Sequence, residues 1–267
     1  MALIHKVSKQ CLKLKRKLCK ENKVIVVGTA HKVGSTWLFN LVKNLGHFEE
    51  INQQLPAQLL DNKTLLLDRP ESLEYLSSLK GYKIFKSHSY PLPSGSIGKI
   101  KYLTIYRDPR DVIISSIFYL SNLDIKRGGW GEEFGRLSEK KRIITFIEKG
   151  DFCVSRLEKW YHVPYAGKIS YEKLKENPLV ALKTIVAFLK LRINDRTIKE
   201  VISHNSFKSR SGRKAGDENK NNILRKGIVG DWKNYFNKDC TYAFKHAKEG
   251  RWNKLLIEMG YEQSPDW

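Results

Sequence analysis

The sequence is poor in acidic residues and in cysteine, and it lacks a long apolar run. It has 28 Asp and Glu against 49 Lys and Arg in 267 residues, a formal net charge of +21. No apolar stretch approaches the roughly 20 residues of a membrane-spanning helix, so we predict no membrane span. The four cysteines form no Cys-x-x-Cys pair and no Cys/His spacing typical of zinc sites: Cys11, Cys19, Cys153 and Cys240. These absences favour a reduced protein in the cytoplasm.

The excess of positive charge implies an anionic ligand or partner. The chain is 41% hydrophobic and 11% aromatic, which suffices for a large core and argues against disorder. We predict one globular domain over residues 23–267. Charge on this scale favours nucleic acid, a membrane surface, a polyanionic glycan or a small phosphorylated ligand, and charge alone does not choose among them.

Residues 1–22 form a basic segment of their own. Seven Lys and Arg precede the first acidic residue, Glu21, and the apolar region of a secretory signal is absent. Apolar residues recur at spacings of three and four, which predicts an amphipathic helix: Ile4, Val7, Cys11, Leu14 and Leu18. We expect this helix to dock on its own domain rather than on an anionic membrane, and we assign it no chemistry.

Strands and helices alternate along the rest of the chain, which predicts an α/β fold with a mostly parallel sheet flanked by helices. The expected strands are residues 23–28, 82–86, 101–106 and 167–170. The expected helices are residues 35–46, 109–120, 139–149, 151–162 and 178–190. Asn177 is the expected N-cap of the last helix, with Pro178 at its first position. The polar run 208–222 lacks periodicity and predicts a long, basic, mobile loop.

The segment GTAHKVGST (28–36) joins the first strand to the first helix. Ligands of open α/β sheets bind there, because helix N-termini offer N–H donors and a positive dipole to anions. The two glycines permit tight turns, Lys32 adds a charge, and the helix begins with two hydroxyl residues. This composition favours an oxyanion site. It breaks the Walker A pattern, which needs Lys directly after the second glycine, and so disfavours a nucleoside or shikimate-like kinase.

Three other segments carry chemistry. KSH (86–88) closes a strand and puts His88 at the ligand edge of the sheet. YRDPRDVIISS (106–116) leaves a strand with Arg107 and carries Ser115 on a helix, a combination that suits a phosphate clamp. LRKGIVGDWKNYF (224–236) groups two cations with a glycine and suits a second phosphate. Each has a structural alternative: a structural histidine, a surface ion pair of Arg107 with a neighbouring aspartate, or solvated charges.

Together the segments resemble the sulfotransferase family, in particular its cytosolic, small-molecule type. HKVGSTW resembles the family's 5′-phosphosulfate loop Y-P-K-S-G-T-T-W, and TIYRDPRDVIIS resembles its 3′-phosphate motif R-N-P-x-D-x-x-x-S. ILRKGIVGDWKNYF is similar to R-K-G-x-x-G-D-W-K-N-x-F, and ISYEKLKENP is similar to Y-E-D-L-x-x-N-P. The order and spacing match over about residues 24–236. The resemblance implies a P-loop-like strand, loop and helix that binds phosphosulfate.

The resemblance also implies the donor 3′-phosphoadenosine 5′-phosphosulfate (PAPS), with adenosine 3′,5′-bisphosphate (PAP) as product, and no metal. Lys32 would contact the bridging oxygen of the sulfate–phosphate bond, and His88, at the His of K-T-H-x-P, would be the general base. With Ser115 these two are the expected catalytic residues. The 5′-phosphate would be held by Gly34, Ser35 and Thr36; the adenine by Trp37, Phe207 and Tyr171; and the 3′-phosphate by Arg107, Ser115, Arg225, Lys226 and Gly227.

The reaction expected from these residues is in-line transfer of a sulfuryl group to a hydroxyl or amine of a small-molecule acceptor. The proton would go to His88, and Lys32 would stabilise charge on the leaving phosphate. Three segments that would face the acceptor match no family motif and leave its identity open: 47–70, 89–98 and 121–137. The family's dimer motif begins at Lys233 but is not retained, so the oligomeric state also stays open.

One alternative keeps the fold without the reaction, as a basic module that binds nucleic acid or a sulfated glycan. The presence of both Lys32 and His88 favours the enzyme, and we therefore expect no nucleic-acid partner. A carbohydrate polymer ranks below a small metabolite as acceptor, because no membrane anchor of the kind typical of lumenal carbohydrate sulfotransferases is present.

Overall fold

The computed structural model describes residues 22–46, 48–61, 64–91, 98–122, 131–150 and 152–267. The amphipathic helix predicted for residues 1–22 lies outside this part except for Asn22, so the boundary at residue 23 stays a prediction. Contacts group the described residues into two compact units. The first comprises those of Met1–Thr29, Gly34–Ile105 and Lys159–Asn205, and the second those of Ala30–Val33, Tyr106–Glu158 and Ser206–Trp267.

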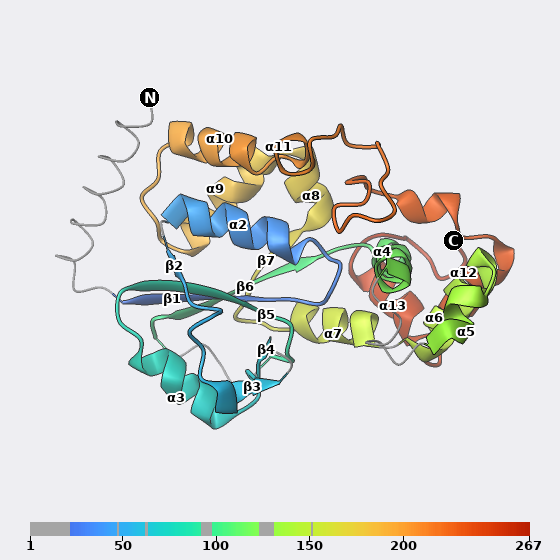
Figure 1. Ribbon diagram of the computed structural model, residues 1–267, viewed down its shortest axis with the longest axis horizontal. Helices are drawn as coiled ribbons and strands as arrows, with labels where there is room; N and C mark the ends of the chain where they lie inside the picture. The colour runs from blue at the N-terminus through green and yellow to red at the C-terminus, as the bar shows by residue number, and fades with distance from the viewer. Residues whose placement is uncertain (1–21, 47, 62–63, 92–97, 123–130, 151) are drawn as a thin grey trace. The chain divides into compact units, whose positions relative to one another are not determined.

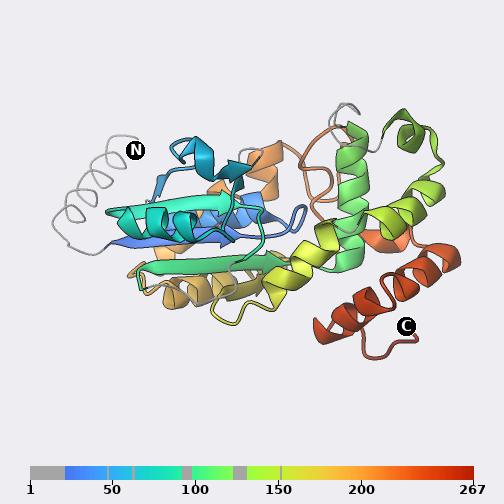
Figure 2. The same cartoon turned by 90° about the horizontal axis from the view of Figure 1, so that it is seen from below.

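The first unit is built on a five-stranded sheet with the order β2-β5-β1-β6-β7. Its strands are β1 (Lys23–Gly28), β2 (Glu49–Glu50), β5 (Tyr82–Ser87), β6 (Ile100–Tyr106) and β7 (Gly167–Ser170). Strand β1 pairs in parallel with β5 and with β6, and β2 pairs in parallel with β5; the arrowheads of β1, β5 and β6 point the same way (Figure 2). The predicted mostly parallel α/β fold is confirmed.

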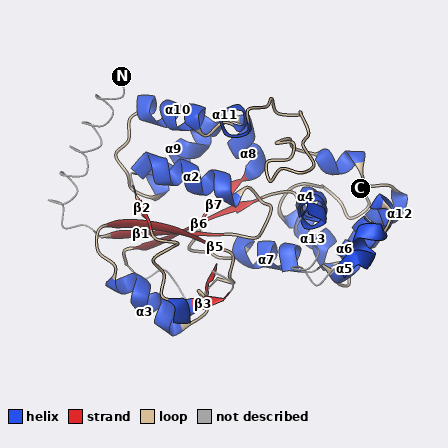
Figure 3. Cartoon of the chain, viewed as in Figure 1, coloured by secondary structure: helices blue, strands red, loops and turns tan. Residues whose placement is uncertain are grey.

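Helices cover both faces of this sheet. Helices α2 (Ser35–Gly46), α8 (Tyr171–Glu176), α9 (Pro178–Phe188) and α10 (Asp195–His204) lie on one face, and α3 (Pro70–Ser78) lies on the other (Figures 1 and 3). A central parallel strand meets a helix layer on each side, which favours apolar side chains along it. In β1, Val24 to Val27 have no exposed surface. The short elements η1 (Ala57–Leu59), β3 (Leu60–Asp61) and β4 (Thr64–Leu65) complete the unit, with β3 antiparallel to β4.

Helix α9 begins as the sequence predicts. The side chain of Asn177 accepts the N–H of Val180, and Pro178 occupies the first turn, where its missing N–H costs nothing. Leu182 and Val186, four residues apart, are buried on one face of the helix. The helix ends at Phe188, two residues early, because Lys190 adopts a left-handed backbone conformation with φ 51°.

The second unit is mainly helical. Its elements are α4 (Pro109–Asn122), α5 (Gly131–Arg136), α6 (Glu139–Lys149), most of α7 (Phe152–Tyr161), α11 (Phe207–Ser211), η3 (Asp231–Asn234), α12 (Lys238–His246) and α13 (Arg251–Glu258). Helix α6 packs against both α4 and α12, and α12 packs against α13. The predicted helices 109–120, 139–149 and 151–162 are confirmed, with ends that shift by two residues at most.

The loop predicted for residues 208–222 is wrong over its first turn. Ser206 accepts the N–H of Ser209 as an N-cap, and residues 207–211 are helical up to Gly212, which has φ 72°. Beyond this turn the guanidinium of Arg213 donates to the carbonyls of Leu224 and Arg225. The Ser206 cap and the hydrogen bonds of Arg213 therefore hold this segment in place, although its sequence has no apolar periodicity.

Candidate functional site

The loop after β1 enters α2 through two residues with positive φ, Lys32 at 63° and Gly34 at 97°. The carbonyl of Gly34 accepts the N–H of Trp37 at 3.0 Å, so α2 begins directly after this glycine. The first N–H groups of a helix have no carbonyl partner within it and carry the positive end of its dipole. Ser35 and Thr36, predicted for the 5′-phosphate, occupy this first turn.

Gly34 is in close contact with Tyr171, the first residue of α8. A Cβ atom at Gly34 would lie 2.7 Å from Cδ2 of the Tyr171 ring, so only glycine fits beside this ring. The same ring meets Trp37 edge to face, with 5.7 Å between the centroids. The indole Nε1 of Trp37 is buried and has no hydrogen-bond partner in the described part of the chain. Within the first unit, the structure thus brings together Trp37 and Tyr171, two of the residues predicted to hold the adenine.

His88 directly follows β5, and its ring is oriented by the backbone. Nδ1 of His88 lies 3.0 Å from the carbonyl oxygen of Thr29. Because a carbonyl only accepts, Nδ1 carries the hydrogen, and the lone pair of the neutral ring is on Nε2. The N–H of Thr29 donates in turn to the carbonyl of Ser87 at 3.1 Å, which joins the ends of β1 and β5. The imidazole is therefore set to accept a proton at Nε2.

Lys86 is a candidate site residue that the sequence reasoning missed. Its Nζ donates to Oγ1 of Thr36 at 3.1 Å, at the start of α2. Burial lowers the pKa of Lys86, partly opposed by the charge of Glu50. The side chain of Asn52 holds the Lys86 backbone through hydrogen bonds of 2.9 and 3.1 Å. A signal was present, since Lys86 stands two residues before His88, where alternation directs side chains to the same face of a strand.

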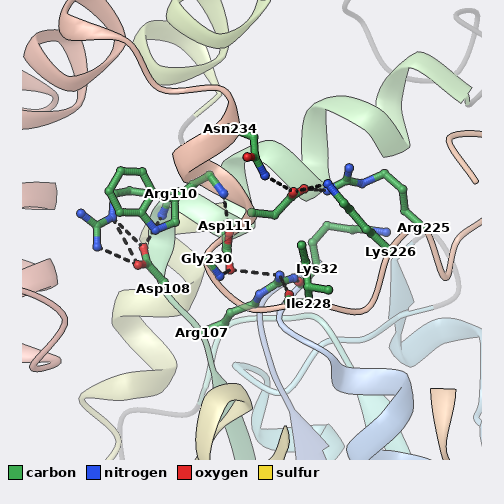
Figure 4. A network of polar contacts seen from close by, with 12 residues as sticks. Lys32, Arg107, Asp108, Arg110, Asp111, Arg225, Lys226, Ile228, Gly230 and Asn234 are labelled. Atoms are coloured by element: carbon green, nitrogen blue, oxygen red, sulfur yellow. Dashed lines mark hydrogen bonds and ion pairs between the residues drawn. The ribbon is translucent and has the colours of Figure 1, made fainter. Parts of the chain in front are cut away.

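In the second unit, Arg107 links three segments at the start of α4. Its guanidinium donates to the carbonyl of Ile228 at 3.0 Å, to Oδ2 of Asp111 at 3.2 Å and to the carbonyl of Lys32 at 3.4 Å (Figure 4). Arg107 and Asp111 are both buried. The pair is therefore not the surface contact that was weighed as the alternative, because its members also hold backbone groups far away in sequence.

Asp111 joins α4 to the turn that opens η3. Its Oδ2 accepts the N–H of Gly230 and its Oδ1 accepts the N–H of Trp232, both at 2.9 Å. The predicted Ser115 lies one helical turn further along α4, on the face of Asp111, and is partly exposed. Arg107, just before α4, and Ser115, in its second turn, are two of the predicted 3′-phosphate residues, and Asp111 between them holds the turn at Gly230.

Arg225 and Lys226 share the carboxylate of Asp231. Lys226 Nζ lies 2.7 Å from Oδ1 of Asp231, and the Arg225 guanidinium pairs with Oδ2 and also with Glu218. The Cζ atom of Arg225 lies 4.3 Å from the centre of the Phe118 ring. Burial raises the pKa of Asp231, but the hydrogen bonds from Lys226 and Arg225 outweigh it, and the pKa lies below its ordinary value. Both cations are thus held in place around one buried anion.

Gly227 and Phe207, two further predicted residues, are in contact. Gly227 has φ 65°, and a Cβ atom there would lie 2.4 Å from Cδ2 of Phe207. The structure therefore gathers the predicted 3′-phosphate residues and Phe207 into the second unit, together with Lys32. The other predicted residues, including His88, belong to the first unit.

Residues 21–255 match the family model described as the sulfotransferase domain. The chain belongs to the sulfotransferase domain family. Sulfotransferase 1B1 of Mus musculus is 26% identical to this sulfotransferase over 258 residues, covering 88% of this chain and 84% of that protein. The enzyme class predicted from the motifs is confirmed.

Solved structures support the same fold for this sulfotransferase. Mouse sulfotransferase SULT7A1 complexed with PAP aligns with a TM-score of 0.59 at 21% identity, covering 89% of each chain. Retinol dehydratase in complex with androsterone and PAP aligns with a TM-score of 0.55 at 18% identity, covering 93% of this chain and 85% of that one. Within the described ranges, no helix of this sulfotransferase is long and apolar enough to cross a membrane. No cluster of three metal-ligating His, Cys, Asp or Glu side chains occurs among the residues described.

Proposed function

We propose that this sulfotransferase transfers the sulfuryl group of PAPS to a hydroxyl or amine of a small-molecule acceptor. The observation that carries the proposal is the partly buried cluster of charged residues in the second unit. In it Arg107 contacts the carbonyl of Ile228, and Asp231 of the same segment holds Arg225 and Lys226. Two motifs that resemble the family's 3′-phosphate site thus meet in space. PAP is bound in the solved structures of two similar proteins, mouse sulfotransferase SULT7A1 and retinol dehydratase, which adds support.

The residues present fit a phosphorylated nucleotide. Arg107, Arg225 and Lys226 supply three cations, of which the arginines can bind a phosphate with two parallel hydrogen bonds. Gly227 offers a backbone without Cβ, and the start of α2 offers N–H donors for a second phosphate. The hydroxyl of Thr29, at the end of β1, is buried without a hydrogen-bond partner among the described residues. An adjacent anion would satisfy this group.

When bound, PAPS supplies an activated sulfuryl group, and its transfer to the acceptor releases PAP. His88 takes the proton of the attacking hydroxyl at Nε2, since Nδ1–H is occupied by the Thr29 carbonyl. Lys32 and the N-terminus of α2 stabilise negative charge on the departing phosphate. Lys86, held at Thr36, is a further cation at the start of α2.

Two measurements test the proposal. Purified protein is incubated with PAPS and a panel of phenols, alcohols and amines, and mass spectrometry is expected to detect the gain of one SO₃ group on at least one acceptor. In parallel, PAP is expected to raise the melting temperature more than ATP does, because a ligand that binds only the folded state stabilises it. Equal shifts with PAP and ATP, or no sulfated product from any acceptor, would contradict the proposal.

A further inference from the structure

Arg110 is buried in the second unit between two tryptophans and two carboxylates. It keeps 2% of its surface exposed. Its Cζ atom lies 3.7 Å from the ring centre of Trp232 and 4.4 Å from that of Trp267. The two indoles meet edge to face, 5.9 Å apart. A guanidinium against two aromatic faces is a strong, shape-specific contact. Arg110 stands at the unspecified x position of the motif R-N-P-x-D-x-x-x-S.

Two carboxylates complete the enclosure of Arg110. Asp108 accepts from Nε at 3.0 Å and from Nη2 at 2.8 Å, and Glu262 accepts from Nη1 at 2.6 Å. Asp108 belongs to the same turn as Arg110, whereas Glu262 comes from the segment that follows α13. The cation of α4 is therefore tied to residues 261–267 through both an ion pair and a ring.

The segment 261–267 is itself fixed to α13. The indole Nε1 of Trp267 donates to Oδ1 of Asn253 at 2.7 Å, and Nδ2 of Asn253 donates to the carbonyl of Pro265 at 3.1 Å. Asn253 is buried. Because one asparagine holds both ends of the Pro265–Trp267 turn, the Trp267 ring has a defined position against Arg110.

This arrangement adjoins the residues that bind the 3′-phosphate in the proposed function. The Trp232 side chain packs on Arg110, while its backbone N–H is held by Asp111. Its neighbour in sequence, Asp231, holds Arg225 and Lys226. Any shift of Trp232 would be transmitted through Asp231 to both cations, because Asp111 holds the Trp232 N–H and the adjacent Asp231 carboxylate holds Arg225 and Lys226.

We propose that Glu262 and Trp267 form a clasp that presses Arg110 onto Trp232 and thereby positions Arg225 and Lys226 for the 3′-phosphate. The clasp residues are positioning residues that act through Trp232 and Asp231. The proposal rests on the proposed function, and it deepens it by making selectivity for a 3′-phosphorylated nucleotide depend on a segment that lies outside the four motifs.

The test compares binding of PAP and of AMP, which lacks the 3′-phosphate, by isothermal titration calorimetry. Trp267→Ala is expected to weaken the binding of PAP about tenfold, because it removes one buried cation–π contact and the ordering that this contact imposes. The affinity for AMP is expected to stay unchanged. Trp267→Phe, which keeps an aromatic face, is expected to retain most of the preference. Lys245→Ala is the matched control, because Lys245 also lies over the Trp267 ring, at 4.9 Å, without contacting the phosphate cluster.

Glu262→Gln provides a second variant if Trp267→Ala does not fold. It removes the charge that faces Arg110 and keeps the size of the side chain. It is expected to weaken the binding of PAP and to leave the binding of AMP unchanged. An unchanged ratio of PAP to AMP affinity in the folded variants would overturn the clasp. A wild-type protein that binds PAP no better than AMP would instead overturn the proposed function, so the two failures are distinct.

Discussion

The ammonium nitrogen of Lys32 lies 4.1 Å from the centre of the Tyr119 ring of α4. Lys32 is also held at its backbone, where its carbonyl accepts from Arg107 and its φ of 63° is unusual for a residue with a side chain. A long, flexible lysine side chain loses much of its conformational freedom in such a contact. The ring therefore fixes the direction of the charge that the proposed function assigns to the leaving phosphate.

Replacing the ring should lower turnover more than donor binding. A cation–π contact contributes about 0.5–2 kcal/mol, so Tyr119→Leu is expected to reduce kcat by up to about thirtyfold. Tyr119→Phe keeps the ring and should stay within about twofold of the wild type, because the face rather than the hydroxyl holds the charge. Steady-state kinetics with the acceptor found in the panel would measure both. Equal losses in the two variants would show that the hydroxyl matters instead.

Removal of the imidazole tests the proton acceptor. His88→Ala is expected to lower kcat by about 10²–10⁴-fold, the usual contribution of a general base, while the dissociation constant of PAP changes little. His204→Ala is the matched control, since His204 also places Nδ1 against a backbone carbonyl, that of Glu200 at 2.7 Å, but is exposed on α10. If His88→Ala kept the wild-type rate, His88 would not be the base.

The carboxylate of Glu218 competes with a bound phosphate for Arg225. Since Glu218 pairs with the Arg225 guanidinium, Glu218→Gln removes one negative charge beside the 3′-phosphate and should tighten PAP binding several-fold without changing AMP binding. Glu200→Gln, which neutralises the exposed partner of Arg196, serves as the control for net charge. Weaker PAP binding in Glu218→Gln would mean that Glu218 positions Arg225 rather than competes for it.

The pKa of Asp231 gives a pH dependence of stability. Burial raises this pKa, but the hydrogen bonds from Lys226 and Arg225 hold it below its ordinary value. A lowered folded-state pKa stabilises the protein above the unfolded pKa, about 4 for aspartate, and that stabilisation is lost as the pH falls through the folded-state value. The difference in free energy of unfolding between wild type and Asp231→Asn should therefore shrink in urea titrations as the pH is lowered from 5 toward 3. A constant difference would contradict the assignment.

Much of the fold follows from signals that are local in sequence. The apolar run Val24–Val27 favours a buried strand, and Asn177 with Pro178 sets the start of α9. Helices α10 and α12 carried equally clear caps, Asn194 and Asn237, which the sequence analysis did not use. The predicted mobile loop failed at residues 208–211 because a cap on a five-residue helix leaves no periodic pattern.

The site was less predictable, because its decisive contacts join residues far apart in sequence. The motifs identified Arg107 and Arg225 as candidates, but nothing local indicates that Asp111 would hold the backbone of Trp232. The sequence analysis assigned Lys86 no role, although its spacing from His88 was a signal, and the contact with Thr36 and the burial of its side chain mark it in the structure. Arg110 and Trp267 are in contact although they are far apart in sequence, and no motif in the sequence indicates this contact.

The cluster around the proposed 3′-phosphate site holds as many carboxylates as cations, and this has a kinetic consequence. Arg107 pairs with Asp111, and Arg225 and Lys226 face Asp231 and Glu218. Beyond about 8 Å, the screening length at physiological salt, such a balanced group exerts little field on an approaching anion. The attraction that speeds encounter with a nucleotide must come from the other cations of a chain with a net charge of +21. Added salt should therefore slow association more than it hastens dissociation. The residence time of the nucleotide is then set by its contacts with the cluster.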